Sequence, residues 1–324
     1  MLGHEWAVTL LSEHVAREQV RHAYLFTGPQ GIGRRTLALR LAQALNCTQP
    51  VRPGEPCFQC RVCQHIDSMQ QPDLAIVQAE QEGGVLRVEQ VRDLQHSLAL
   101  APYEARYRVA LLLRFEEAHP SAMNALLKTL EEPASQVILM LTADSAESLL
   151  PTIVSRCMVL RLRPLSIDQV ARGLQELWGI PGDQARLLAH ISGGRPGYAY
   201  SLFRYPERLE RRRVWLDDHF QLLSASQVQR FAYAETLAKD KESLRMALLV
   251  WLSFWRDVLL RTAGASAEIS NVDCSQEVDE IAARIDLSSA HRMVSTVERI
   301  LDLLSRNINP RLAAEIVMLD LPHR

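Results

Sequence analysis

The first half of the chain alternates short apolar runs with longer amphipathic stretches. The apolar runs cover residues 22–26, 74–77, 109–113 and 137–142 and are nearly continuous, as expected for parallel strands buried on both faces. Helical patterns lie between them, at about 34–46, 87–99 and 121–132. The last pattern has an apolar face and a terminating proline, formed by Met123, Leu126, Leu127, Leu130 and Pro133. This alternation predicts an α/β domain of the nucleotide-binding type.

The second half of the chain is predicted to be helical, because strand signals fade after residue 163. Helical patterns and a glycine-rich turn follow, at about 166–177, 183–191 and 192–203. The apolar run 246–260 is interrupted by Arg256 and Asp257, which favours a buried bundle helix over a membrane span. We therefore expect three domains: an α/β domain over 1–163, a small helical domain over 164–207 and a helical bundle over 208–324.

Composition supports an ordinary globular protein with two or three cores. The 324 residues are 48% hydrophobic and 23% charged, and the formal net charge is -2. This balance gives no overall nucleic-acid footprint, so any contact with DNA must be local or shared with partners. No apolar segment reaches the roughly 18–20 residues of a membrane span, and the N-terminal MLGHEWAV lacks a signal-peptide pattern. We expect a cytoplasmic protein.

Four of the six cysteines lie close together in the segment 47–63, at Cys47, Cys57, Cys60 and Cys63. Their spacing, C-x9-C-x2-C-x2-C with Pro and Gly between, predicts a closed structural Zn²⁺ site. A loop with so few apolar groups gains its folding energy from the metal. The alternative is a set of reduced free thiols. The two remaining cysteines, Cys157 and Cys274, are isolated and are expected to be packed thiols.

The stretch 27-TGPQGIGRRTLALR-40 follows an apolar run and leads into a helical pattern, as a phosphate-binding loop does. Gly28 and Gly33 fit the pattern G-x-x-x-x-G-K-[ST], but Arg34 and Arg35 replace the Lys and the hydroxyl that binds Mg²⁺. A guanidinium is donor-only and cannot ligate a metal ion. We expect a degenerate loop whose glycines, Gly31 included, serve tight turns with positive φ. Weak binding of phosphate by backbone N–H groups is the alternative.

Several segments resemble the AAA+ clamp-loader family of bacterial DNA polymerase III. They are 22-HAYLFTGPQGIG-33, the four-cysteine insertion after the loop helix, 124-NALLKTLEEP-133 and 155-SRC-157. The resemblance is dense over residues 20–164 and continues beyond as a general domain order. It implies an AAA+ domain, a small helical lid and a helical collar that joins five subunits in a ring.

The resemblance also implies partners. They are the motor subunits (gamma/tau) and the delta subunit of a hetero-pentameric ring, and through them the sliding clamp and primer–template DNA. A membrane partner is not implied. The chain would be part of a DNA-directed DNA polymerase (nucleotidyltransferase) holoenzyme.

A motor subunit of this family carries an Asp–Glu pair after its third apolar strand, and those acids position Mg²⁺ and the attacking water. The corresponding residues are Leu113 and Arg114, which cannot do this. We therefore expect no ATP hydrolysis by this subunit and no bound ATP. Glu116 and Glu117 lie slightly further on and could substitute after a shift in register. The favoured interpretation is that both are solvated acids at a helix start.

Arg156 has a different expected role. In the family, the arginine of the SRC motif, here flanked by Ser155 and Cys157, acts in trans as an arginine finger. It reaches the γ-phosphate that a neighbouring subunit holds, and a planar guanidinium suits that charge. The alternative is a surface arginine paired with a local acid. Arg195 resembles the position that senses nucleotide in the motor lid, but a structural role is expected here.

These features favour a non-hydrolysing ring subunit, a stator, that helps load the sliding clamp onto primed DNA. One alternative is an active gamma/tau-type motor, which four positions oppose: Arg34, Arg35, Leu113 and Arg114. Another is a zinc-containing nucleic-acid binding protein unrelated to clamp loading. The near-neutral charge and the NALLKTLEEP helix oppose that class.

Overall fold

The computed structural model describes residues 1–81, 84–305 and 308–322. They form two compact units, which are described separately below. An α/β unit comprises Met1–Gln169 together with Gly194–Tyr198. A helical unit comprises Val170–Gly193 together with Ala199–Arg324. The expected boundary at residue 163 and the further division of the helical part into lid and collar stay predictions.

The α/β unit is built on a five-stranded parallel sheet with the order β2-β3-β4-β1-β5. The strands are β1 (Ala23–Thr27), β2 (Leu74–Val77), β3 (Arg108–Leu112), β4 (Val137–Ala143) and β5 (Met158–Arg161). Every residue of β1 and β4 is buried, as their continuous apolar runs predict. The four expected strands are confirmed. The fifth, β5, was missed because it is a short edge strand in which only one residue is buried.

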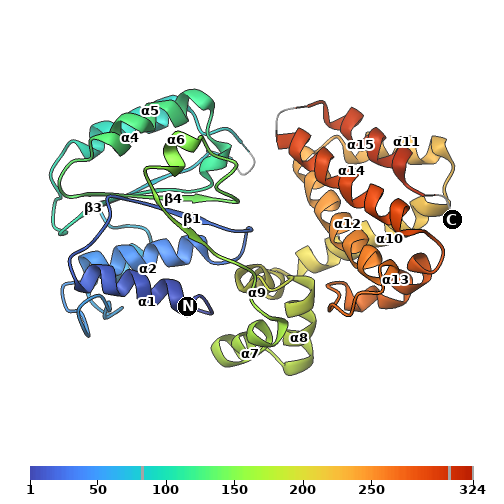
Figure 1. Cartoon of the computed structure of the whole chain (residues 1–324), viewed down its shortest axis with the longest axis horizontal. Helices are drawn as coiled ribbons and strands as arrows, with labels where there is room; N and C mark the ends of the chain where they lie inside the picture. Colours follow the sequence, from blue (N-terminus) through green and yellow to red (C-terminus); the bar gives the residue numbers. More distant parts are fainter. Residues whose placement is uncertain (82–83, 306–307, 323–324) are drawn as a thin grey trace. The chain divides into compact units, whose positions relative to one another are not determined.

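Helices cover both faces of the sheet, with α1 and α2 on one face and α4 and α5 on the other (Figure 1). The helices of this part are α1 (Glu5–Ala16), α2 (Arg34–Asn46), α3 (Arg61–Asp67), α4 (Val88–Leu98), η1 (Phe115–Glu117), α5 (Pro120–Glu131) and α6 (Pro151–Val154). In α5, Pro120 occupies the first turn and Met123, Leu126 and Leu130 are buried against the sheet. The expected helices α2, α4 and α5 are confirmed, whereas α1, α3 and α6 were not expected.

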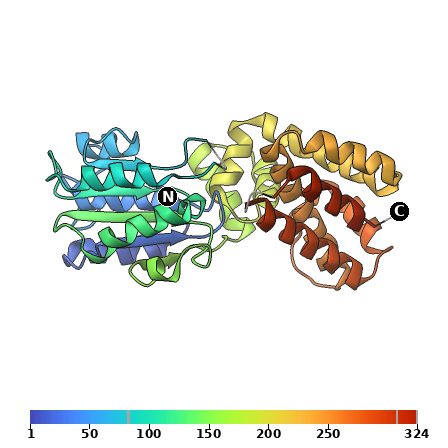
Figure 2. The same ribbon diagram turned by 90° about the horizontal axis from the view of Figure 1, so that it is seen from above.

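The helical unit contains most of the chain after the sheet. Its helices are α7 (Ile167–Trp178), α8 (Gly182–Ile191), α9 (Pro196–Arg204), α10 (Pro206–Ser224), α11 (Gln227–Leu237), α12 (Lys241–Thr262), η2 (Val272–Cys274), α13 (Ser275–Ala282), α14 (Leu287–Ser305) and α15 (Pro310–Asp320). The first residues of α7 and α9 belong to the α/β unit. Helix α12 packs against α10, α13 and α14, and α14 packs against α15 (Figure 2). Trp251, Phe254 and Trp255 of α12 are wholly buried, as their helical spacing predicts.

Arg230 is a buried arginine that joins two helices of this bundle through hydrogen bonds. Its guanidinium donates to main-chain carbonyls at the ends of α10 and α15, at distances of 2.7–3.3 Å from Leu222, Leu223, Met318, Leu321 and Pro322. Carbonyls at helix ends have no partner within the helix. One side chain therefore donates hydrogen bonds to the carbonyls at the ends of both helices.

Among the described residues, no helix is both long and apolar enough to cross a lipid bilayer.

Candidate functional site

The glycine-rich loop that the sequence predicts to be a degenerate phosphate loop lies between β1 and α2. Gly28, Gly31 and Gly33 have φ values of 139°, 83° and 113°, which confirms the prediction of positive φ at all three. A Cβ added to Gly28 would lie 2.4 Å from the carbonyl oxygen of Leu162, and one added to Gly31 would lie 2.7 Å from Cβ of Tyr198. The backbone conformation and close packing therefore account for glycine at these positions, whether or not a phosphate binds.

Protein atoms already engage the loop backbone. The Gly28 N–H lies 3.1 Å from the carbonyl oxygen of Asp144 and 3.3 Å from that of Ala143. The Gly197 N–H at the start of α9 donates to the carbonyl oxygen of Gly31 over 2.8 Å. These contacts fix the start and the middle of the loop and do not involve the N–H groups at the start of α2, which are the ones that would bind an anion.

The buried side chain of Arg34 is directed at two carboxylates, of which Asp144 is half exposed and Glu116 is mostly buried. The Arg34 side chain is only 7% exposed, and Nη1 lies 2.8 Å from Oδ1 of Asp144 and 3.9 Å from Oε1 of Glu116. Burial raises the pKa of Glu116 to about 7, with a further contribution from the Asp144 carboxylate; Arg34 opposes the shift. One guanidinium faces two carboxylates and lies nearer to Asp144. Below about pH 7 the Glu116 carboxyl therefore holds a proton, and the cluster is close to neutral without a metal ion or phosphate.

The two positions that correspond to a motor's acidic pair hold no acid. Leu113 directly follows β3 and is buried, and Arg114 follows with φ 48°. The Arg114 side chain donates through Nε to both carboxylate oxygens of Glu117 at 3.0 Å. The expectation that Glu116 and Glu117 are solvated is wrong, because their side chains are 17% and 18% exposed and each faces an arginine. Glu117 is therefore engaged in an ion pair, and Glu116 is a mostly buried carboxyl beside Arg34.

Arg35 and Arg195 lie near the loop but make other contacts. Arg35 Nη2 lies 2.9 Å from the sulfur of Met69, beyond the end of α3. The Arg195 guanidinium lies 4.5 Å from the ring centroid of Tyr198. Tyr198 is the residue that packs against Gly31.

Arg156 follows the short helix α6, whose last turn is capped by Ser155. Its Nη1 donates to the carbonyl oxygen of Thr152 over 2.8 Å, and its Nη2 donates to Oε1 of Glu131 over 2.7 Å. The Arg156 side chain is 34% exposed. Cys157 packs against the core between the sheet and α5, and burial raises the pKa of its thiol to about 12. The SRC motif thus has a partly buried thiol, packed against the core, beside a partly exposed guanidinium.

The four cysteines of the segment 47–63 come together as a cluster. Their Sγ atoms all lie within 4.8 Å of one another, and those of Cys47 and Cys57 are 3.5 Å apart. Tetrahedral Zn²⁺ with Zn–S bonds of about 2.3 Å requires sulfurs about 3.8 Å apart. The donor set and its spacing therefore fit a structural zinc ion. No other group of three or more metal-binding side chains occurs within the described ranges.

Backbone N–H groups favour the thiolate form at two of the four cysteines, Cys57 and Cys60. The N–H groups of Cys60 and Gln59 lower the pKa of Cys57, which accepts their hydrogen bonds. Burial opposes ionisation of Cys60, yet hydrogen bonds from the Cys63 and Thr48 backbone and from neighbouring side chains lower its pKa to about 6. Burial raises the pKa of Cys47 and of Cys63. A cation among the four sulfurs stabilises the charged form of all of them.

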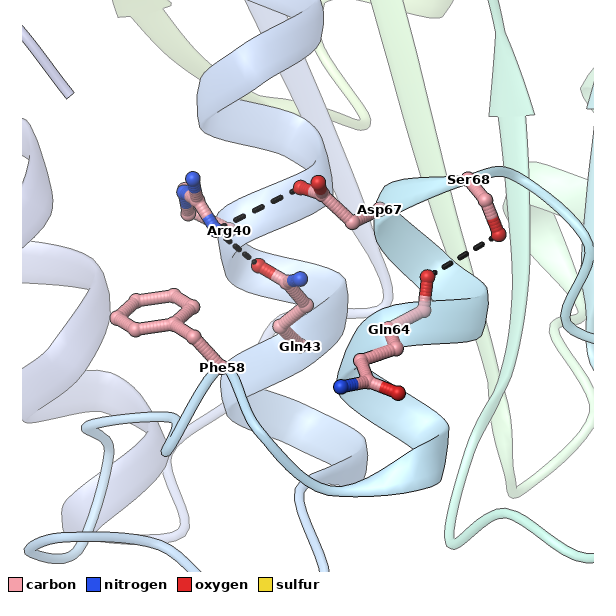
Figure 3. A pocket seen from close by; sticks show the side chains of 6 residues that line it. All are labelled: Arg40, Gln43, Phe58, Gln64, Asp67 and Ser68. Atoms are coloured by element: carbon pink, nitrogen blue, oxygen red, sulfur yellow. Dashed lines mark hydrogen bonds and ion pairs between the residues drawn. The ribbon is translucent and has the colours of Figure 1, made fainter.

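The cysteine segment is fixed to α1 and α2. Gln43 of α2 donates to the carbonyl oxygen of Cys63 over 2.7 Å. A hollow of about 520 Å³ lies beside this contact, lined by Arg40, Gln43, Phe58, Gln64, Asp67 and Ser68 (Figure 3). The Arg40 guanidinium lies 4.4 Å from the centroid of the Phe58 ring and 3.7 Å from Asp67. The charge of Arg40 is therefore compensated locally, and the hollow is part of the packing between the cysteine segment and α2.

Sequence reasoning missed three participants: Asp144, Glu131 and Tyr198. A signal for Asp144 was present, since it lies two residues beyond the expected strand 137–142. The carboxyl ends of parallel strands gather at one edge of a sheet, where phosphate loops also lie. Glu131 and Tyr198 carry no comparable local signal.

Comparisons with known proteins assign the family. The family profile described as "DNA polymerase III, delta subunit" matches residues 3–166, and "DNA polymerase III, delta subunit, C terminal" matches 206–323. DNA polymerase III subunit delta' of Pseudomonas aeruginosa is 35% identical over 262 residues, covering 79% of this chain and 76% of that protein. The delta' subunit of Bacillus subtilis is 28% identical over 304 residues, covering 93% of this chain and 90% of that protein.

More distant relatives share part of the sequence or the fold. DNA polymerase III subunit tau of Escherichia coli is 33% identical over 177 residues, covering 55% of this chain and 27% of that protein. The crystal structure of a gamma subunit-related protein of Thermotoga maritima shares the fold, with a TM-score of 0.50, 17% identity and 97% coverage of both chains. The chain belongs to the delta' family of bacterial DNA polymerase III clamp-loader subunits.

Proposed function

We propose that this chain is a non-hydrolysing subunit of the clamp-loader ring, a stator that helps load the sliding clamp onto primed DNA. The observation that carries the proposal is the ion pair between Arg34 and Asp144. Arg34, which stands at the position of the phosphate-binding lysine, is already paired with a carboxylate of its own chain. With Leu113 and Arg114 in place of the acids, the chain holds neither the metal nor the attacking water.

The ring context follows from the same proposal. The partners are gamma/tau motor subunits and a delta subunit in a hetero-pentameric ring, in the cytoplasm, and DNA and the clamp are reached through the ring. Residues 164–207 act as a lid and 208–324 as a collar that joins the subunits. Support comes from the similarity to delta' and tau chains.

The contribution of this subunit to catalysis is Arg156, acting on ATP held by a neighbour. Its guanidinium is partly exposed at the end of a short helix, and it is fixed from both sides. A preorganised guanidinium stabilises the charge that develops on a transferring phosphoryl group. Nothing in this role requires nucleotide in the chain's own loop.

The test is Arg156→Ala in the reconstituted ring. We expect assembly to be retained, because a surface ion pair contributes less than about 1 kcal/mol. We expect the clamp- and DNA-stimulated ATPase to fall, since the one site that Arg156 serves loses about 10²-fold or more in rate. The loss is partial for the whole ring, because other sites take arginines from other subunits. Arg156→Lys rescues poorly, because an ammonium lacks the planar fork.

Arg161→Ala is a matched control. Arg161 lies five residues further on and also pairs with a surface carboxylate, at 3.3 Å from Glu147. That variant is expected to turn over ATP at the wild-type rate. Rings with Arg156→Ala that assemble normally and are as active as the Arg161→Ala rings would refute the finger assignment.

The cysteine cluster is proposed to hold one structural Zn²⁺ through Cys47, Cys57, Cys60 and Cys63. Four thiol groups within 4.8 Å close the coordination sphere and leave no position for a substrate. The ion would fix the segment against α1 and α2 and would take no part in ATP chemistry. Metal analysis of protein never exposed to chelator should find about one zinc per chain. Protein that is folded and free of metal would contradict this site.

A further inference from the structure

Arg156 is held by two groups from different helices. Nη1 donates to the Thr152 carbonyl oxygen of α6, and Nη2 donates to the Glu131 carboxylate at the end of α5. These contacts use two of the five N–H donors of a guanidinium and fix its plane. The remaining donors belong to a side chain that is one-third exposed. The arginine is therefore oriented before it meets any ligand.

Glu131 is well placed to orient another group. It is the last residue of α5, and the preceding Leu130 is only 2% exposed in the core beneath the helix. Ile153, next to Thr152 in α6, is wholly buried in the same core. The backbone positions of both contacts are therefore fixed by packing.

A carboxylate at this position does not serve the helix itself. The C-terminal end of a helix carries partial negative charge, so an acid there is unfavourable for helix stability. The Glu131 carboxylate instead lies 2.7 Å from the guanidinium of Arg156. The contact with Arg156 offsets the repulsion between the Glu131 carboxylate and the C-terminal end of α5. The carboxylate therefore serves Arg156 rather than its own helix.

We propose that Glu131 is a positioning residue for Arg156: it fixes the guanidinium so that the free N–H donors face the phosphoryl group of ATP in the neighbouring subunit. This inference rests on the proposed function and adds a residue to it. The pair is half exposed, with 51% of the Glu131 side chain accessible. Such a contact is too weak to withhold the arginine from a phosphate. It is strong enough to shift the population of a flexible side chain by about twofold to fivefold.

The experiment uses the complete ring with Glu131→Gln, Glu131→Ala, Arg156→Ala and the double variant Glu131→Gln/Arg156→Ala. We expect each Glu131 variant to lower the stimulated kcat of the site that depends on Arg156 by about twofold to fivefold, with KM for ATP unchanged. In the Arg156→Ala background, Glu131→Gln should have no further effect, because its target is gone. Glu132→Gln, at the adjacent exposed position, is the matched control and should keep the wild-type rate.

The outcomes separate the two proposals. If Arg156→Ala slows the ring and both Glu131 variants do not, the positioning role is refuted and the finger stands. If Glu131→Gln slows the Arg156→Ala ring as much as it slows the wild-type ring, Glu131 acts by another route and the inference is wrong. An increase in kcat in the Glu131 variants would show that the acid restrains the arginine, which also overturns it. If Arg156→Ala has no effect, the finger assignment itself fails.

Discussion

Replacing Glu116 with Gln tests whether this carboxyl is protonated beside Asp144 and Arg34 in the folded protein. Burial and the nearby Asp144 raise the pKa of Glu116 from 4.5 to about 7, and Arg34 only partly opposes this. The folded protein then binds a proton that the unfolded chain releases between those pH values. This acid therefore contributes stability that is complete below about pH 4.5 and is lost as pH rises through about 7.

The size of the effect follows from the shift. Between about pH 5 and pH 7.5, the contribution of Glu116 to the free energy of unfolding falls by about 2 kcal/mol. Gln cannot ionise, so Glu116→Gln lacks this fall. As pH rises from about 5 to about 7.5, the free energy of unfolding of the variant should therefore increase by about 2 kcal/mol relative to that of wild type. For a unit of this size, this corresponds to about 4–8 °C in the difference in Tm.

The assay is a thermal unfolding series of both proteins against pH, read as the difference in Tm. The difference cancels contributions that the two share, such as those of the histidines and the cysteine cluster. Glu117→Gln is the control, because it removes a carboxylate one residue away that pairs with Arg114 rather than Arg34. A Tm difference between Glu116→Gln and wild type that is flat from pH 5 to pH 7.5 would refute the charge cluster as described.

Three further predictions concern other parts of the chain. Arg230→Ala should lower the free energy of unfolding of the helical unit by about 3–5 kcal/mol in denaturant titrations, because buried carbonyls of α10 and α15 lose their donor; Arg230→Lys should recover part of this. Titration calorimetry with Mg-ATP on the isolated subunit should detect no micromolar binding, and a turnover assay no hydrolysis; binding that Arg34→Ala abolishes would favour a motor. Cys60→Ser should lower both the bound zinc and the Tm, with no direct effect on ring ATPase; unchanged zinc content would exclude Cys60 as a ligand.

The sequence predicted those parts of the fold that depend on local pattern. The strands β1 and β4 are buried on both faces, so their apolar runs stand out, and the glycines of the loop have the positive φ that their turn requires. The short edge strand β5 was missed because only one of its residues is buried.

Pairings distant in sequence were harder to predict. The partner of Arg34 lies 110 residues away in Asp144, and no periodicity connects the two. For the same reason Glu116 was misjudged as solvated. Glu116 faces Arg34, which lies 82 residues earlier in the chain and therefore outside any local window.

The packing of Gly31 against the start of α9 separates the glycine pattern from nucleotide chemistry. A side chain at Gly31 would overlap the backbone of Tyr198, and one at Gly197 would lie 2.8 Å from the carbonyl oxygen of Gly31. Steric exclusion alone therefore requires glycine at both positions, whether or not the loop binds ATP. A motif search that counts the loop glycines would assign an ATPase to this chain on the strength of two backbones that must touch.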